Sequence, residues 1–141
     1  MNTYCISVIT DTSESEVGVY VMLDGKTQQI THQTGTIVSH RGYSHENYPN
    51  NVDSTLRLEI DGILLIRIAV TDFELESRLK QSGSCIDYLE IEGQKYCGVE
   101  LASNTTYESA TGALNMKFHT DSQSRDKGFL FEYRYYSHGE F

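Results

Sequence analysis

Apolar and polar side chains alternate along most of this chain, and a period of two is the pattern of a β-strand with one buried face. Residues 56–60 alternate leucine and isoleucine with charged side chains, and residues 114–119 alternate apolar with polar side chains in the same way. Residues 63–70 are apolar except for Arg67, which predicts a strand in the middle of a sheet. The predicted strands span residues 4–10, 17–23, 34–39, 56–60, 63–70, 86–92, 95–97, 114–119 and 129–135.

Short polar turns separate these strands. Asp24-Gly25, Asp61-Gly62 and Glu92-Gly93 are dipeptides typical of tight turns, and residues 40–54 form a longer polar loop. No stretch of ten residues keeps the 3.6-residue period of a helix. The chain is therefore predicted to be all-β, with its strands arranged as an antiparallel β-sandwich.

Length and charge narrow the class of protein. The 141 residues correspond to one domain with a core of its own. The net charge of −9 argues against binding to nucleic acid or to anionic membranes, so cationic partners or metal ions fit better. No apolar run reaches the roughly 18 residues of a membrane-spanning helix.

Acidic residues are concentrated between Thr71 and Gly98, where six carboxylates accompany three basic side chains. The acids are Asp72, Glu74, Glu76, Asp87, Glu90 and Glu92, and the bases are Arg78, Lys80 and Lys95. Like charges this close repel one another unless a cation lies among them. Either these acids are spread over solvated strand faces, or some of them converge on a metal ion.

Seven short motifs follow one another between Gly35 and Tyr136. They are GTIVS (35–39), NYPNN (47–51), FELE (73–76), CIDYLEI (85–91), YCG (96–98), LNMKFHTD (114–121) and GFLFEY (128–133). In this order they resemble the CUB domain family, the extracellular β-sandwich module of complement and tolloid proteases, neuropilins and spermadhesins. The resemblance implies a CUB-like jelly roll over residues 35–141. Residues 1–34 are interpreted as extra N-terminal strands added to the sandwich, or as the edge of a neighbouring domain.

The resemblance also implies a calcium site, because Ca²⁺ prefers oxygen ligands and some CUB domains supply them from acidic loops. The corresponding ligands here are Glu76, Asp87, Asp121 and the backbone carbonyl of Gln123. Tyr48 and Ser122 correspond to positions that support the site. The alternative is that all of these are surface groups of an acidic protein. The other acids of residues 71–98 are interpreted as solvated strand positions.

Cysteine usage fits the same family. Cys85 and Cys97 match its second disulfide, and closing a loop of about a dozen residues stabilises a fold by about 3 kcal/mol. The family's first disulfide has no counterpart, as in some calcium-binding members. The spacing from Cys85 to Asp87 is one residue shorter than usual. Cys5 lies outside the resemblance and is interpreted as a buried thiol or as the partner of a cysteine elsewhere in a larger chain.

These observations predict a non-catalytic, secreted module that binds Ca²⁺ and a protein partner. The resemblance implies that a lysine or arginine of the partner reaches Glu76 and Asp121, with Tyr48 as an apolar wall. Asn104 begins an N-glycosylation sequence, which suits an extracellular protein. No secretory signal is recognised at Met1. The alternatives are a carbohydrate-binding or oligomerisation module without functional Ca²⁺, and an accessory domain of a larger secreted enzyme.

Overall fold

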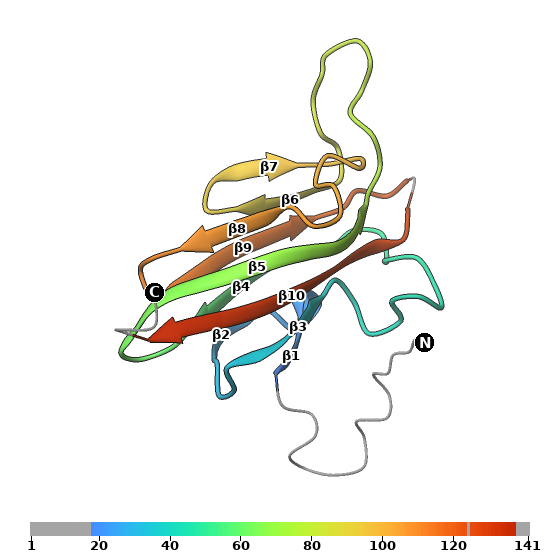
Figure 1. Ribbon diagram of the computed structural model, residues 1–141. Helices are drawn as coiled ribbons and strands as arrows, with labels where there is room; N and C mark the ends of the chain where they lie inside the picture. Colours follow the sequence, from blue (N-terminus) through green and yellow to red (C-terminus); the bar gives the residue numbers. More distant parts are fainter. Residues whose placement is uncertain (1–17, 124, 138–141) are drawn as a thin grey trace.

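The computed structural model describes residues 18–123 and 125–137, and these residues form two five-stranded sheets packed face to face (Figure 1). The strands are β1 (Val19–Val21), β2 (Lys26–Gln29), β3 (Thr34–Val38), β4 (Asp53–Glu59), β5 (Ile63–Glu74), β6 (Tyr88–Ile91), β7 (Gln94–Tyr96), β8 (Thr106–Ser109), β9 (Ala113–His119) and β10 (Gly128–Ser137). The order in the first sheet, sheet A, is β1-β3-β10-β5-β8, and the order in the second, sheet B, is β2-β4-β9-β6-β7.

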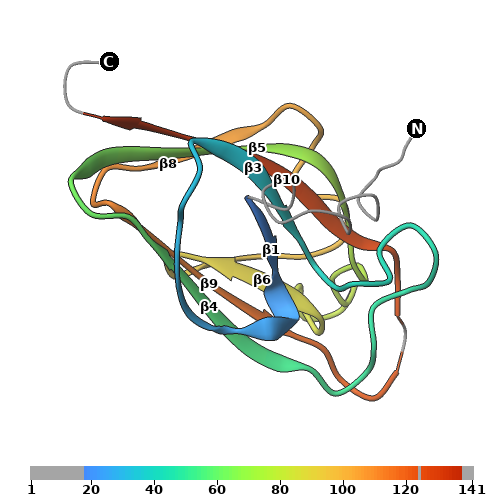
Figure 2. The ribbon, with the colours of Figure 1, turned by 90° about the horizontal axis from the view of Figure 1, so that it is seen from below.

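The predicted all-β sandwich is confirmed. Figure 2 shows β3, β5, β8 and β10 on one side of the molecule and β4, β6 and β9 on the other. Within residues 18–123 and 125–137, one 3₁₀ turn, η3 (Met22–Asp24), interrupts the strands and there is no α-helix. No helix in this part of the chain is therefore long and apolar enough to cross a membrane.

Two strand pairs depart from the predicted antiparallel arrangement, because β1 pairs with β3 and β2 pairs with β4 in parallel. The chain passes from β1 through η3 into sheet B as β2 and then returns to sheet A as β3. A crossover of this kind makes neighbouring strands run the same way, whereas a hairpin reverses the chain. The pairing also needs glycine at position 35, where a Cβ would lie 2.1 Å from the carbonyl oxygen of Gly18.

The core lies between the two sheets and is richest in aromatic side chains along β10. Phe129 and Phe131 are fully buried, with ring centroids 4.9 Å apart, and Phe118 of sheet B meets Phe129 edge to face at 5.4 Å. On the opposite face of β10, Leu130 is also buried, because Tyr43 of the long loop covers it.

One end of the sandwich gathers several loops that are far apart in the sequence. The loop before β4 is tied to the segment after β9, because the backbone N–H of Asn51 donates to the carbonyl of Asp121 at 2.8 Å. The same loop reaches the segment before β10 through the N–H of Tyr48, which donates to the carbonyl of Asp126 at 3.1 Å. The long connection from β5 to β6 leaves from this end of β5 and extends beyond the sheets (Figure 1). The strand predicted at residues 4–10, together with Cys5, lies outside the described residues.

Candidate functional site

Three carboxylates from distant segments meet at this end of the sandwich. One oxygen of each of Glu76, Asp87 and Asp121 lies within 4.8 Å of the others. Glu76 follows the end of β5, Asp87 immediately precedes β6, and Asp121 follows the end of β9. The two sheets therefore bring together the three acids that the sequence singled out.

Asp87 is the centre of the cluster, because both of its carboxylate oxygens accept hydrogen bonds. The hydroxyl of Tyr48 donates to Oδ2 at 2.7 Å, and the backbone N–H of Asp121 donates to Oδ1 at 3.0 Å. The same Tyr48 hydroxyl accepts the backbone N–H of Glu76 at 3.2 Å. One phenol thus fixes two of the three acid-bearing segments relative to each other.

Burial makes the ionised form of Asp87 costly in the absence of a cation. Asp87 has no exposed surface. Burial raises the pKa of its carboxyl and the charge of Asp121 raises it further, outweighing the opposing hydrogen bonds from the Asp121 N–H and the Tyr48 hydroxyl. A cation held among these oxygens would remove that cost.

Tyr48 is a neutral hydrogen-bond donor in this arrangement. Burial, followed by the hydrogen bond to Asp87, raises the pKa of its phenol far above the usual range. The ring packs edge-on against Phe118 with centroids 5.3 Å apart, and it has no exposed surface. This corrects the expectation that Tyr48 would offer an apolar wall to a partner, because a side chain without exposed surface makes no such contact.

The residue set fits a hard divalent cation. The available atoms are carboxylate oxygens, which Ca²⁺ prefers, and Asp87 is shielded from water while Glu76 and Asp121 are half-buried. Oε1 of Glu76 is itself buried. The site therefore has one fully buried acid and two half-buried acids.

The segment after β9 orients the third acid. The backbone N–H of Gln123 donates to Oδ1 of Asp121 at 2.9 Å, and Asn51 holds the Asp121 carbonyl. Ser122 and Gln123 are both exposed. The role of the Gln123 carbonyl as a ligand and the supporting role of Ser122 stay predictions. Sequence reasoning did not identify Asn51, whose contribution is made through the backbone.

A disulfide helps to hold two of the three acid-bearing segments, those of Asp87 and Glu76, against each other. Cys85 and Cys97 are bonded with their Cα atoms 5.7 Å apart, as the resemblance implied. Cys85 is two residues from Asp87, while Gly98, next to Cys97, donates its N–H to the carbonyl of Glu76 at 3.0 Å. The crosslink thereby holds the Asp87 segment against the Glu76 segment.

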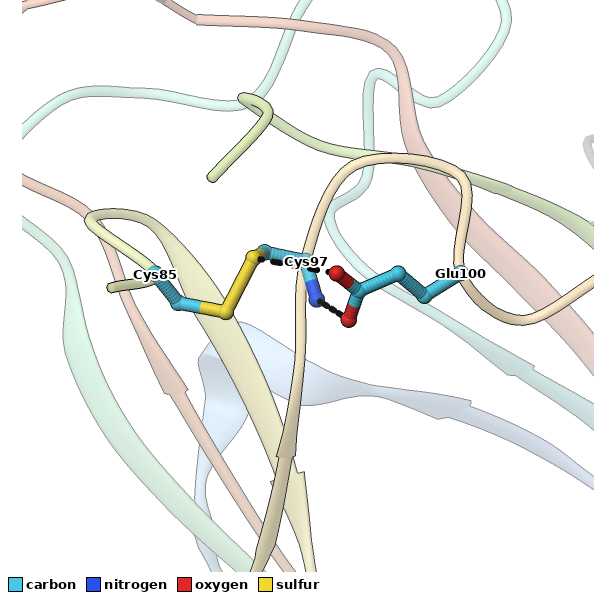
Figure 3. Close-up of side chains that lie close together, drawn as sticks. All are labelled: Cys85, Cys97 and Glu100. Carbon is cyan, nitrogen blue, oxygen red and sulfur yellow. Dashed lines mark hydrogen bonds between the residues drawn. A yellow bond between two sulfur atoms is a disulfide. The ribbon is translucent and has the colours of Figure 1, made fainter. Parts of the chain in front are cut away.

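The side chain of Glu100 points back toward Cys97 of this disulfide, as Figure 3 shows. Its carboxylate accepts the backbone N–H of Cys97 at 3.0 Å and pairs with the guanidinium of Arg78. Cys85, Cys97 and Glu100 lie as close together as the three acids do, but both sulfurs are already bonded to each other. This second cluster is therefore structural.

Two other acids of residues 71–98, Asp72 and Glu92, form ion pairs or hydrogen bonds away from the cluster. Asp72 forms an ion pair with Lys127 at 2.8 Å and accepts a hydrogen bond from the hydroxyl of Tyr43. Glu92 accepts the backbone N–H of Asn115 at 2.8 Å. Asn104 lies in an exposed turn before β8, and its glycosylation stays a prediction.

Replacing Tyr48 by phenylalanine is expected to destabilise the fold by about 1 to 3 kcal/mol, because Oδ2 of buried Asp87 loses its donor and the N–H of Glu76 loses its acceptor. The measurement is urea unfolding in the presence of EDTA. Tyr107→Phe, at a half-buried position of β8, is the matched control and should change stability far less. Equal stability of Tyr48→Phe and the unsubstituted chain would contradict a positioning role for the hydroxyl.

Comparisons with known proteins give one consistent result. A family model described as the CUB domain matches residues 25–133. The chain is 32% identical over 92 residues to the suppressor of tumorigenicity 14 protein homolog of Bos taurus, a match that covers 64% of this chain and 10% of that protein. The chain thus spans about a tenth of the length of this curated relative.

Solved structures share the fold. The full extracellular region of zebrafish Gpr126/Adgrg6 superposes with a TM-score of 0.67 at 19% identity, over 81% of this chain and 15% of that one. The crystal structure of the MASP-1 CUB2 domain bound to Ca²⁺ superposes with a TM-score of 0.61 at 23% identity, over 76% of this chain and 96% of that one. At these identities the likeness concerns the arrangement of the strands.

Proposed function

The chain belongs to the CUB domain family, and from that premise we propose that it is a non-catalytic extracellular recognition module that binds Ca²⁺ through Glu76, Asp87 and Asp121. The observation that carries the proposal is the convergence of three carboxylates, from the ends of three strands, around a fully buried aspartate. Carboxylates so placed repel one another, and Ca²⁺ both neutralises them and accepts six to eight oxygen ligands.

Each residue of the site would have a distinct role in binding the ion. Asp87 would be the inner ligand, since Tyr48 and the Asp121 N–H already fix its two oxygens. Glu76 and Asp121 would complete the acidic set, with the Gln123 carbonyl and water in the remaining positions and Ser122 beside them. When bound, the ion would tie together loops that otherwise meet through hydrogen bonds and the Cys85–Cys97 disulfide.

The two half-buried acids also supply a surface for a partner. Glu76 and Asp121 keep part of their surface exposed, so they could bind Ca²⁺ and a cationic side chain of the partner together. The net charge of −9 favours a partner with exposed lysine or arginine. Tyr48 contributes by positioning Asp87, and the partner would meet the two acids alone.

The family comparisons support this function without extending it to any whole relative. A CUB domain of similar fold, MASP-1 CUB2, was solved bound to Ca²⁺. Because the chain spans only about a tenth of its curated relative, we propose that it acts as one module of a larger extracellular protein.

Binding to a lysine-containing peptide tests the proposed function. The peptide is expected to bind in Ca²⁺, to be released by excess EDTA, and to lose at least tenfold in affinity for Asp121→Ala, measured by biolayer interferometry. Glu90→Ala, which removes a half-buried acid on the outer side of β6, is the matched control and should bind the peptide as before. Equal affinity with and without EDTA would overturn the proposal.

A further inference from the structure

A second site lies on the outer face of sheet A, away from the three acids. A cavity of about 540 Å³ crosses β3, β10 and β5 at the level of Thr36, Glu132 and Ala69, which are direct neighbours across these strands. Glu132 and Arg134 point outward there, because the alternating residues Phe131 and Tyr133 are buried in the core.

This cavity and the metal centre are separated along β5. Arg67 lines the cavity, and the acidic cluster begins beyond Glu74 at the far end of the same strand. Seven residues of extended chain span about 23 Å. The two sites are therefore physically independent.

Two arginines stand directly opposite each other at the wall of the cavity. Arg134 of β10 is in register with Arg67 of β5, and like charges facing each other across antiparallel strands destabilise a sheet. Arg67 is compensated by an ion pair with Glu108 at 2.6 Å. Among the described residues, Arg134 has no carboxylate within ion-pair distance, and its guanidinium lies 5.4 Å from the ring centre of Tyr136. A cation in a chain of net charge −9 is thus left facing an open cavity.

The remaining lining is small and polar. Thr34, Gly35, Thr36 and Ala69 are small, and the hydroxyls of the two threonines can donate and accept hydrogen bonds. Glu132 adds an acceptor for hydroxyl donors, and it also repels a ligand that carries many negative charges. The large rings among the described lining residues are Tyr136 and Tyr133, and Tyr133 is buried in the core, so the lining offers little apolar surface to anchor a peptide.

We infer that this cavity binds a saccharide unit that carries a single acid group. The guanidinium of Arg134 receives the carboxylate of the sugar in a charge-assisted hydrogen bond, with Arg67 beside it. The hydroxyls of the sugar meet Glu132 and the two threonines. A heavily sulfated chain is excluded by Glu132, Glu108 and the overall charge, and an acidic peptide finds no apolar anchor.

Titration of the full chain in EDTA tests this inference independently of the calcium proposal. The probes are 3′-sialyllactose and a glucuronate disaccharide, with lactose as the uncharged counterpart and sodium acetate as the free anion. We expect saturable binding of at least one acidic sugar, detected as amide shifts by NMR, and at least tenfold weaker binding of lactose and acetate.

Arg134→Gln is expected to lower the affinity for the acidic sugar at least tenfold, whereas Arg41→Gln, at an arginine with 74% exposure elsewhere on the surface, leaves it unchanged. Lack of binding by both acidic sugars, acetate binding as tight as theirs, or equal affinity of Arg134→Gln and the unsubstituted chain would each overturn the inference. Ca²⁺ binding, measured separately on the same variants without EDTA, bears only on the metal centre.

Discussion

Replacing Asp87 by asparagine is expected to abolish Ca²⁺ binding and to leave the chain folded. Asparagine keeps the shape of the side chain and an acceptor for the N–H of Asp121, but it removes the only fully buried charge of the acidic cluster. In the unsubstituted chain, Ca²⁺ at 100 times its dissociation constant adds about 2.7 kcal/mol, equivalent to roughly 8 to 10 °C in melting temperature. Asp87→Asn should show no such shift, and calorimetric titration should detect no binding.

The contribution of Asp87 to the stability of the fold is expected to fall with rising pH in EDTA, whereas the stabilisation by Ca²⁺ is expected to grow. In EDTA, the raised pKa of Asp87 makes a contribution to stability that is complete below the unfolded pKa of about 4 and is lost as pH rises through the folded-state pKa. In Ca²⁺ the carboxylate form is required, so the calcium-dependent shift shrinks as pH falls through the same window. Melting curves of Asp87→Asn in EDTA should lack this contribution.

Comparison of variants at the same pH isolates Asp87 from the other carboxyls. Burial would raise the pKa of Asp72, but its bonds to Lys127 and Tyr43 lower it overall, so Asp72 loses its contribution as pH falls in both proteins. Asp61→Asn, in an exposed turn between β4 and β5, should retain the full calcium response. A normal calcium shift in Asp87→Asn would remove Asp87 from the ligand set.

The strands that sequence predicted best are those in which one face is buried by the opposite sheet. Residues 56–60 and 114–119 became β4 and β9, and the apolar run at 63–70 became the first part of β5. The sequence did not predict β2 or β8. β2 has the polar sequence KTQQ and β8 lies at the edge of its sheet, so neither shows a clear apolar pattern. Both strands are held in place mainly by backbone pairing with their neighbours. The parallel pairs depend on the crossover at η3, which has no signature of its own.

The family motifs identified the acids of the cluster, but the position of the Tyr48 side chain that holds them depends on packing. Tyr48 lies in a polar, turn-rich segment, NYPNN, that gives no sign of burial. Its ring is buried only because the loop closes over the end of the sandwich against Phe118. The sequence also gave no indication that Arg67 and Arg134 lie opposite each other. Their position follows from the register of two strands in which these residues are 67 positions apart.

Removing the disulfide, by Cys85→Ala with Cys97→Ala, is expected to lower the free energy of unfolding by about 3 kcal/mol. It should also weaken Ca²⁺ binding by about tenfold, because the crosslink sets the positions of two of the three acids. Cys85 leads directly into Asp87, and the segment after Cys97 is hydrogen-bonded to the backbone of Leu75 and Glu76. Without the crosslink, ordering of these segments becomes a cost of binding the ion.

A variant that is destabilised at a position away from the acids shows whether lower stability alone weakens Ca²⁺ binding. Leu114→Ala, at a fully buried position near the start of β9, is expected to destabilise the fold by about 2 to 5 kcal/mol without touching the acid-bearing segments. Its Ca²⁺ affinity, measured by calorimetry at a temperature where both variants remain folded, should equal that of the unsubstituted chain. If the disulfide variant and Leu114→Ala bind Ca²⁺ equally well, the crosslink stabilises the fold alone and does not organise the site.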